Sequence, residues 1–187
     1  MALSSCSVSL APAEYVAWIE EEANNLRQVK EISNIQYQLQ YRPLNYIAAK
    51  EKRKVNLPEQ ELLERTSKLK GSLYFSLRLN LKNNAQDILL HEINGEQDYF
   101  ARVSYCNAAM ADDIKLVDGK DTLACSLFQY VPNYGVAPFA DFVFAFEDKE
   151  TKGDKTILFN DRLFGAGNLQ FQFKEEDIEN IPEIITE

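Results

Sequence analysis

The chain has 187 residues, of which 45% are hydrophobic and 11% aromatic, the composition of a folded domain rather than of a disordered segment. A chain of this length buries roughly 70% of its extended surface, so it folds as one domain without cross-links. The formal net charge is −9 at pH 7. Such a surface repels phosphate backbones, so we expect no nucleic-acid partner. The chain has no run of the roughly 18 apolar residues that a spanning helix needs.

The opening residues Leu3, Ser4, Ser5 and Cys6 resemble the lipobox of bacterial lipoproteins. In that family a Leu and two small residues mark a cleavage site, and the Cys becomes the lipid-bearing first residue of the mature protein. The resemblance implies lipid attachment at Cys6, membrane contact through that anchor, and a tether over residues 1–11. It also implies a location in the cell envelope, on the periplasmic or surface side of the outer membrane. The alternative is a disordered terminus with an incidental cysteine.

Two helices are expected near the front of the chain. Over residues 12–30, Pro12 suits the first turn of a helix, and apolar residues recur at helical spacing. These residues are Tyr15, Trp18, Ile19, Leu26 and Val29. Over residues 57–70, Asn56 and Glu59 have the spacing of a capping box.

A strand is expected between these helices. Residues 34–41 ("NIQYQLQY") alternate apolar and glutamine side chains, which is the period-two pattern of a strand with one wet face. Pro43 ends or bends this strand, because it has no N–H to donate. Residues 44–50 are a candidate continuation beyond the bend.

From residue 72 onward the period of two dominates. Apolar and polar residues alternate over 72–82 and 168–174, a Phe-rich strand is expected over 138–148, and Asp118-Gly119 has hairpin-turn chemistry. The remaining expected strands cover residues 98–106, 114–117, 122–131 and 155–161. Seven or eight strands separated by turns predict a mainly β fold. We expect an antiparallel β-sandwich forming a single domain over residues 12–187, with an N-terminal helix and one helical insertion.

This second part of the chain resembles the immunoglobulin-like modules of exported lipoproteins from Gram-negative bacteria. The resemblance lies in the strand Tyr74–Asn80, the Asp118-Gly119 turn and the Phe-rich strand Phe139–Phe146. It implies an immunoglobulin-like sandwich and a binding or assembly role in the cell envelope. The Trp and paired Cys of antibody-type domains are not in place, since Trp18 lies in an expected helix.

Two further cysteines, Cys106 and Cys125, lie at strand-like segments. They form a candidate disulfide if the compartment is oxidising. The alternative is a pair of buried reduced thiols that act as small apolar side chains.

No constellation of residues points to catalysis. His91 is the only histidine, which excludes a multi-histidine metal site, and the sequence has no Gly-x-Ser-x-Gly elbow. Gly165 and Gly167 lack the third glycine and the following helix of a dinucleotide site. The acidic residues do not follow the EF-hand spacing and form a solvated loop, with calcium binding as the alternative; they are Asp112, Asp113, Asp118 and Asp121. We expect no metal, no cofactor and no catalytic residue.

The candidate binding loop is the aromatic and proline-rich segment "QYVPNYGVAP". Its residues are Tyr130, Pro132, Tyr134 and Pro138. Rings on a loop held by a rigid sandwich provide a binding surface. The alternative is that the rings cover the end of the core.

These patterns favour a non-enzymatic binding or assembly module of the cell envelope, with an envelope protein or a glycan as partner. One alternative is a carboxylate-dependent hydrolase or carbohydrate-active protein on a β scaffold, because 29 Asp and Glu residues are available. Another is a subunit that pairs by strand addition through residues 34–41, if that strand lies at a sheet edge.

Overall fold

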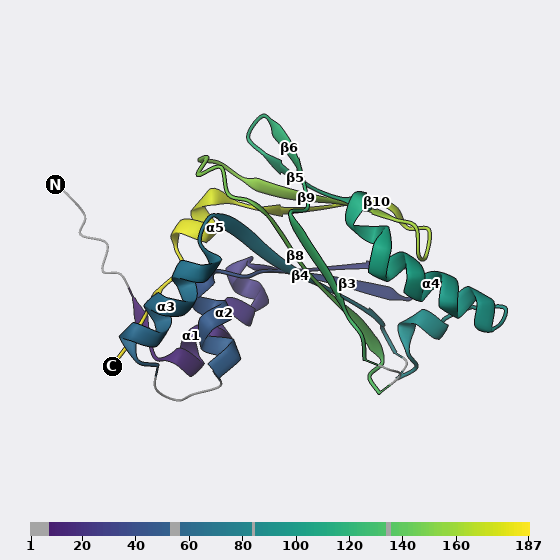
Figure 1. Cartoon of the computed structure of the whole chain (residues 1–187), viewed down its shortest axis with the longest axis horizontal. Helices are drawn as coiled ribbons and strands as arrows, with labels where there is room; N and C mark the ends of the chain where they lie inside the picture. Colours follow the sequence, from purple (N-terminus) through teal and green to yellow (C-terminus); the bar gives the residue numbers. More distant parts are fainter. Residues whose placement is uncertain (1–7, 53–56, 84, 134–135) are drawn as a thin grey trace.

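The computed structural model describes residues 8–52, 57–83, 85–133 and 136–187. The fold is mainly β, with two antiparallel sheets, a short two-stranded parallel sheet and several helices (Figure 1). Packing of the two larger sheets against each other makes the fold sandwich-like, as the alternating sequence pattern predicts.

The larger sheet has five strands in the order β2-β3-β4-β8-β7, and every neighbouring pair is antiparallel. Its strands are β2 (Arg27–Ile32), β3 (Ile35–Tyr41), β4 (Ser72–Leu81), β8 (Phe139–Glu147) and β7 (Leu127–Val131). The expected strands over 34–41, 72–82 and 138–148 are confirmed here. The strand 34–41 pairs with a neighbour on each side, so it is not at a sheet edge. The hypothesis that the protein pairs with a partner by strand addition through this strand is therefore wrong.

The second sheet has four antiparallel strands in the order β10-β9-β5-β6. Its strands are β10 (Gly167–Phe173), β9 (Lys155–Asp161), β5 (Ile114–Asp118) and β6 (Asp121–Ala124). The β5–β6 hairpin turns at Gly119, whose φ of 62° is a left-handed conformation that glycine adopts without steric cost.

The main core lies between the two sheets. Phe75 of β4 stacks on Phe144 of β8 with ring centroids 6.0 Å apart, and it also meets Phe173 of β10 at 5.5 Å. Tyr37 of β3 reaches the other sheet, where its hydroxyl donates a hydrogen bond of 2.7 Å to Asp161. The alternate residues of β3, β4 and β8 therefore form one apolar face that packs on the second sheet.

Three helices, α1 (Pro12–Glu20), α2 (Leu44–Lys52) and α3 (Glu59–Leu69), gather at one end of the molecule (Figure 1). They form a second apolar cluster that includes Tyr15, Ile19 and Tyr46 and packs against Tyr74 of β4. Tyr74 alternates with the core residues Leu73 and Phe75, so these helices cover the outer face of the five-stranded sheet.

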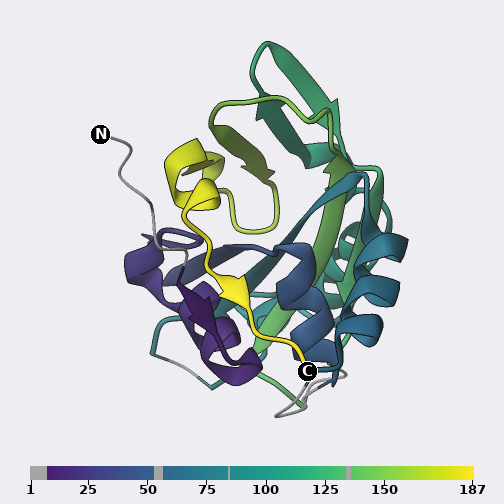
Figure 2. The same cartoon turned by 90° about the vertical axis from the view of Figure 1, so that its left-hand side faces the viewer.

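Two short strands from opposite ends of the described chain pair beside these helices. The strands β1 (Ser9–Leu10) and β11 (Glu183–Ile184) pair in parallel next to α1 (Figure 2). The short helix α5 (Glu175–Glu179) leads into β11. At the opposite end of the molecule, α4 (Glu96–Ala108) packs against the main core (Figure 1). Three 3-10 turns complete the elements: Glu22–Asn24, Ile88–Leu90 and Met110–Asp113.

The expected helix over residues 12–30 is wrong in its second half. The helix α1 ends at Glu20, and Asn25 adopts a left-handed φ of 59° before the chain enters β2. Six residues of β2 pair with β3, and the turn between the strands has Ser33 at a φ of 57°. Leu26 and Val29 have the helical spacing of three residues, but pairing with β3 decides the structure of this segment.

Two other segments are helical where strands were expected. Residues 44–52 form α2 rather than a continuation of β3, because Pro43 stands just before the first turn and its carbonyl accepts the Ile47 N–H. Residues 98–106 lie in α4, whose Tyr99, Val103 and Cys106 meet the core at spacings of four and three.

The second expected helix, over residues 57–70, is confirmed as α3. Its N-cap is Pro58, which makes no side-chain capping bond, and Asn56 lies outside the described residues. The immunoglobulin-like topology is not confirmed. In that topology the third strand leaves the sheet of the first two, whereas β2, β3 and β4 are consecutive in one sheet.

The main core predicts a large stability difference between two phenylalanines. Phe144 is fully buried and Phe100 is 63% exposed on α4. We expect Phe144→Ala to lower the free energy of unfolding by about 3–5 kcal/mol, because it removes a packed ring and leaves a cavity. Phe100→Ala should change it by less than about 0.5 kcal/mol. Urea unfolding followed by circular dichroism measures both, and equal small losses would contradict this placement of the core.

Candidate functional site

A hollow of about 510 Å³ lies on the outer face of the five-stranded sheet, beside the helices α1 and α2. This volume is within the range of small-molecule sites. We call it the sheet-face pocket. The sheet contributes Arg27, Gln38, Gln40, Ser76, Arg78 and Asp141. The helices add Glu20, Tyr46 and Lys50, and Arg42 comes from the segment between β3 and α2.

Strand register brings the sheet residues together. Gln38 of β3 stands opposite Arg78 of β4, which stands opposite Asp141 of β8. In the next row, Gln40 stands opposite Ser76. Because side chains alternate along a strand, these polar residues lie on the face away from the core.

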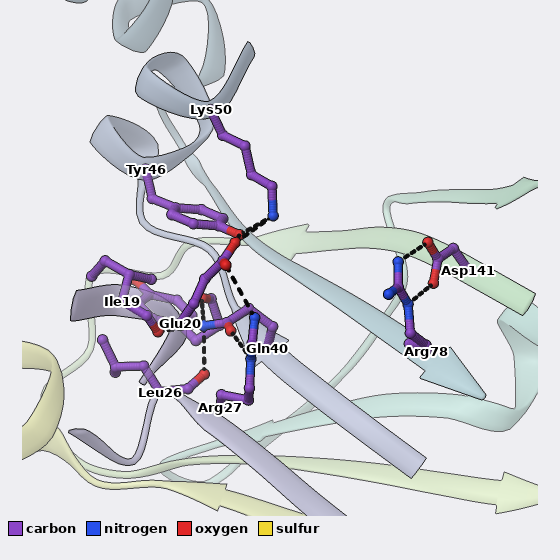
Figure 3. Close-up of polar contacts among 10 residues, drawn as sticks. Ile19, Glu20, Leu26, Arg27, Gln40, Tyr46, Lys50, Arg78 and Asp141 are labelled. Atoms are coloured by element: carbon purple, nitrogen blue, oxygen red, sulfur yellow. Dashed lines mark hydrogen bonds and ion pairs between the residues drawn. The ribbon is translucent and has the colours of Figure 1, made fainter. Parts of the chain in front are cut away.

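Gln40 fastens the pocket wall to the sheet. Its side chain is almost fully buried, and its amide nitrogen donates to the carbonyls of Ile19 at 3.0 Å and Leu26 at 2.9 Å (Figure 3). Its amide oxygen accepts a 2.9 Å bond from Arg27. The Ile19 carbonyl belongs to the end of α1, and the Leu26 carbonyl to the start of the β2–β3 hairpin. Gln40 therefore holds the end of α1, and with it Glu20, against the sheet.

Glu20 is the centre of a charged network. Its carboxylate accepts a 2.7 Å bond from the Tyr46 hydroxyl, pairs with Lys50, and lies 3.5 Å from Arg27 (Figure 3). Burial alone would raise the pKa of Glu20, but the bonds from Lys50 and Tyr46 outweigh it and hold the pKa below the ordinary value. Glu20 therefore stays ionised and is neutralised by its neighbours.

The second carboxylate of the pocket is also paired. Arg78 donates two parallel bonds of 2.7 Å to the oxygens of Asp141 (Figure 3). The Arg78 guanidinium also lies 3.7 Å from the ring centroid of Phe139. This fork-to-fork geometry fixes both side chains on the sheet surface.

Arg42 differs from the other cations. Among the described residues its guanidinium makes no hydrogen bond or ion pair. It lies 5.9 Å from the centroid of the Tyr46 ring, and Glu51 and Asp141 attract it only at longer range. Burial lowers the pKa of Arg42 from its ordinary value. Four cations and two carboxylates line the pocket, Arg27, Arg42, Lys50 and Arg78 against Glu20 and Asp141. The pocket is therefore locally positive on a chain of net charge −9.

Within the described residues, the expected binding loop meets this pocket only through Val131; its candidate residues Tyr130, Pro132 and Pro138 do not line it. Tyr130 is 8% exposed and packs on Phe142 with ring centroids 5.3 Å apart, so its ring covers the core, as the alternative held. Burial raises the pKa of Tyr130 to about 12. Pro132 is exposed and Pro138 half-buried. Tyr134 lies outside the described residues, and so does Cys6.

Cys106 and Cys125 are free thiols in the structure, one buried in α4 and the other half-buried between β6 and β7. Burial raises the pKa of each thiol to about 12, so both stay protonated at neutral pH. His91 ends a 3-10 turn, and its Nε2 lies 3.7 Å from the Glu92 carboxylate.

Two residues of the acidic loop are bound to cations at separate places. Asp113 pairs with Arg162, and Asp118 pairs with the buried Lys155. Within the described ranges, no group of three or more His, Cys, Asp or Glu side chains is arranged to hold a metal ion. None of the helices in those ranges is long and apolar enough to cross a membrane.

Sequence reasoning missed the pocket residues. The glutamines of β3 and Arg78 of β4 were interpreted only as a wet strand face, and α2 was not expected as a helix. The available signal was a positive charge at Arg78 and at Arg42, each next to uncharged polar residues on the same strand face. Comparisons of the chain with protein-family models, curated proteins and solved structures found no match.

The Glu20 network predicts a pH-dependent stability. The folded-state pKa of Glu20 is lowered, so its contribution is present above the ordinary value of 4.5 and is lost as the pH falls through the lowered pKa. We expect Glu20→Gln to lower the free energy of unfolding by about 0.5–1 kcal/mol at pH 7, a small value because solvent screens these contacts. The deficit should shrink below pH 4.5.

Urea unfolding at several pH values measures this change. Glu64→Gln is the matched control, because Glu64 and Lys68 form an exposed pair four residues apart on α3. It should lower stability by less than about 0.5 kcal/mol. A deficit for Glu20→Gln that stays constant from neutral to acidic pH contradicts the charged network.

Proposed function

We propose that the protein is a non-enzymatic binding module whose sheet-face pocket takes an anionic ligand. The observation that carries this proposal is Arg42, a half-buried guanidinium without an anionic partner among the described residues. Removing a charge from water is costly unless it is paired. A ligand carboxylate or phosphate supplies the missing partner, and a guanidinium binds either with two parallel hydrogen bonds.

The other charges of the pocket support the same assignment. Glu20 is neutralised by Lys50 and Arg27, and Asp141 by Arg78. Neither carboxylate is therefore free to repel an incoming anion at contact distance. Two positive charges remain in excess. One is shared by Lys50 and Arg27 around Glu20, and the other is on Arg42, which has no anionic partner among the described residues.

The hydrolase alternative has less support from this site. A glycosidase needs one carboxylic acid whose pKa is raised so that it can donate a proton. The pKa of Glu20 is lowered instead, by hydrogen bonds from Lys50 and Tyr46 that outweigh the effect of burial. Asp141 is held by two bonds from Arg78. The two carboxylates are therefore better arranged to form ion pairs with their neighbours than to transfer a proton.

We expect the ligand-free Arg42→Gln variant to be as stable as the wild type or more stable by up to about 1 kcal/mol, because an unpaired, partly buried charge is removed. Its affinity for acetate and inorganic phosphate should fall roughly 10-fold or more, the value of a charge-assisted hydrogen bond. Titration followed by nuclear magnetic resonance shifts measures affinity, and urea unfolding measures stability.

Lys68→Gln is the control for this experiment. It removes the same unit of charge from an exposed residue of α3 that lies outside the pocket. Its anion affinity should match that of the wild type. Absence of anion binding to the wild type, or the same loss in both variants, would falsify the proposal.

We also propose that the module is held in the cell envelope by a lipid on Cys6. The support is the resemblance of Leu3 to Cys6 to a lipobox and of the later strands to exported lipoprotein modules. Expression of the natural gene product in a Gram-negative host with radiolabelled palmitate tests it. The label should appear in the wild type and be absent from Cys6→Ser. An unlabelled wild type would contradict the proposed lipid anchor.

A further inference from the structure

The sheet-face pocket holds three polar side chains that have no partner within the described residues. They are the Gln38 amide of β3, the Ser76 hydroxyl of β4 and the Arg42 guanidinium. All three are half-buried, so solvent or a ligand can reach them. Gln40, on the same face of β3 as Gln38, is buried instead, and its amide is fully used. The three unpaired groups therefore mark the part of the pocket that is available to a ligand.

Their positions follow from strand register. Gln38 and Gln40 are successive residues on one face of β3, and Ser76 stands opposite Gln40 on β4. Gln38 and Ser76 are thus diagonal neighbours, roughly 7–8 Å apart at the backbone. Arg42 follows one residue after β3, where its N–H bonds to the Tyr74 carbonyl in the next row. One small ligand can span these groups, because all three line the same pocket.

Their chemistry restricts the ligand. A guanidinium only donates hydrogen bonds, whereas an amide side chain and a hydroxyl both donate and accept. Acetate accepts bonds but has none to donate, so it leaves the Gln38 carbonyl unpaired, and inorganic phosphate at neutral pH has only one or two O–H groups to donate. The complementary ligand carries an anionic group and also several O–H groups.

The surrounding groups agree with a hydroxylated ligand. Glu20 and Asp141 keep acceptor sites for ligand hydroxyls beside their cations, because a carboxylate accepts about four bonds. The lining is mostly polar, with Val131 and Val143 among its few apolar side chains. An apolar or flat aromatic ligand therefore finds little surface to bury.

We infer that the sheet-face pocket takes an acidic sugar, whose carboxylate binds Arg42 and whose hydroxyls bind Gln38 and Ser76. This inference rests on the proposed anion-binding function and adds the class of ligand. It identifies the glycan, rather than the envelope protein, as the partner of this site.

The experiment compares glucuronate with acetate, inorganic phosphate and glucose as probes of the full chain. Calorimetry or nuclear magnetic resonance titration should give glucuronate at least 10-fold tighter binding than any of the other three. Gln38→Ala and Ser76→Ala should each weaken glucuronate binding roughly 5-fold, the value of one hydrogen bond. Both variants should leave acetate binding unchanged, because acetate uses only Arg42.

Gln36→Ala is the matched control. Gln36 lies on the same strand and face as Gln38 and is half-buried like it, but it bonds to Glu31 and does not line the pocket. Its glucuronate affinity should equal that of the wild type. Circular dichroism and urea unfolding check that all three variants fold.

The outcomes separate this inference from the proposed function. If acetate or phosphate binds through Arg42 but glucuronate binds no tighter, the inference of an acidic sugar is wrong and the proposed anion-binding function is retained. Phosphate binding tighter than glucuronate also overturns it, in favour of a phosphorylated ligand. If none of the anions binds, both proposals fail.

Discussion

Side chains alternate between the two faces of β3, β4 and β8, so the core and the pocket are built on opposite faces of the same strands. Phe75 and Leu77 pack between the sheets, while Ser76 and Arg78 line the pocket on the outer face. A slip of one residue would place Arg78 in the core and expose the phenylalanine rings. The energy that holds the sandwich together therefore also fixes the order of the polar groups in the pocket.

Gln40 connects this sheet to the helices that form the pocket wall. It is a buried polar residue on the outer face, and its cost is offset because both ends of its amide are bonded. Its bond to the Ile19 carbonyl holds the end of α1, so Glu20 lies beside Lys50 and Tyr46. The fold thus neutralises the pocket's carboxylates internally, and among the described residues it leaves the pocket cation Arg42 without an anionic partner.

The sequence predicts secondary structure well where the apolar residues fit only the helical or only the strand period, and poorly where they fit both. Residues 72–82 alternate strictly, and helix would scatter their leucines around its axis, so β4 follows from the pattern alone. Residues 98–106 contain Tyr99, Val103 and Cys106 at helical spacing within a run that also fits a strand, and contact with the core decides for α4. The pocket escapes sequence reasoning for another reason: Gln38, Ser76 and Asp141 become neighbours only through strand register, across about a hundred residues of chain.

A net charge of −9 and a positive pocket are compatible because they act over different distances. At physiological salt the Debye length is about 8 Å, so the acidic surface repels a distant anion only weakly, whereas a half-buried guanidinium in contact with its ligand is screened much less. Polyanions experience the whole surface and are disfavoured, which agrees with the expectation of no nucleic-acid partner. If the proposed function holds, a small ligand that carries one charge enters the pocket, and its affinity must then come from contact hydrogen bonds. We therefore expect the proposed site to select among anions by their hydroxyl pattern rather than by their charge.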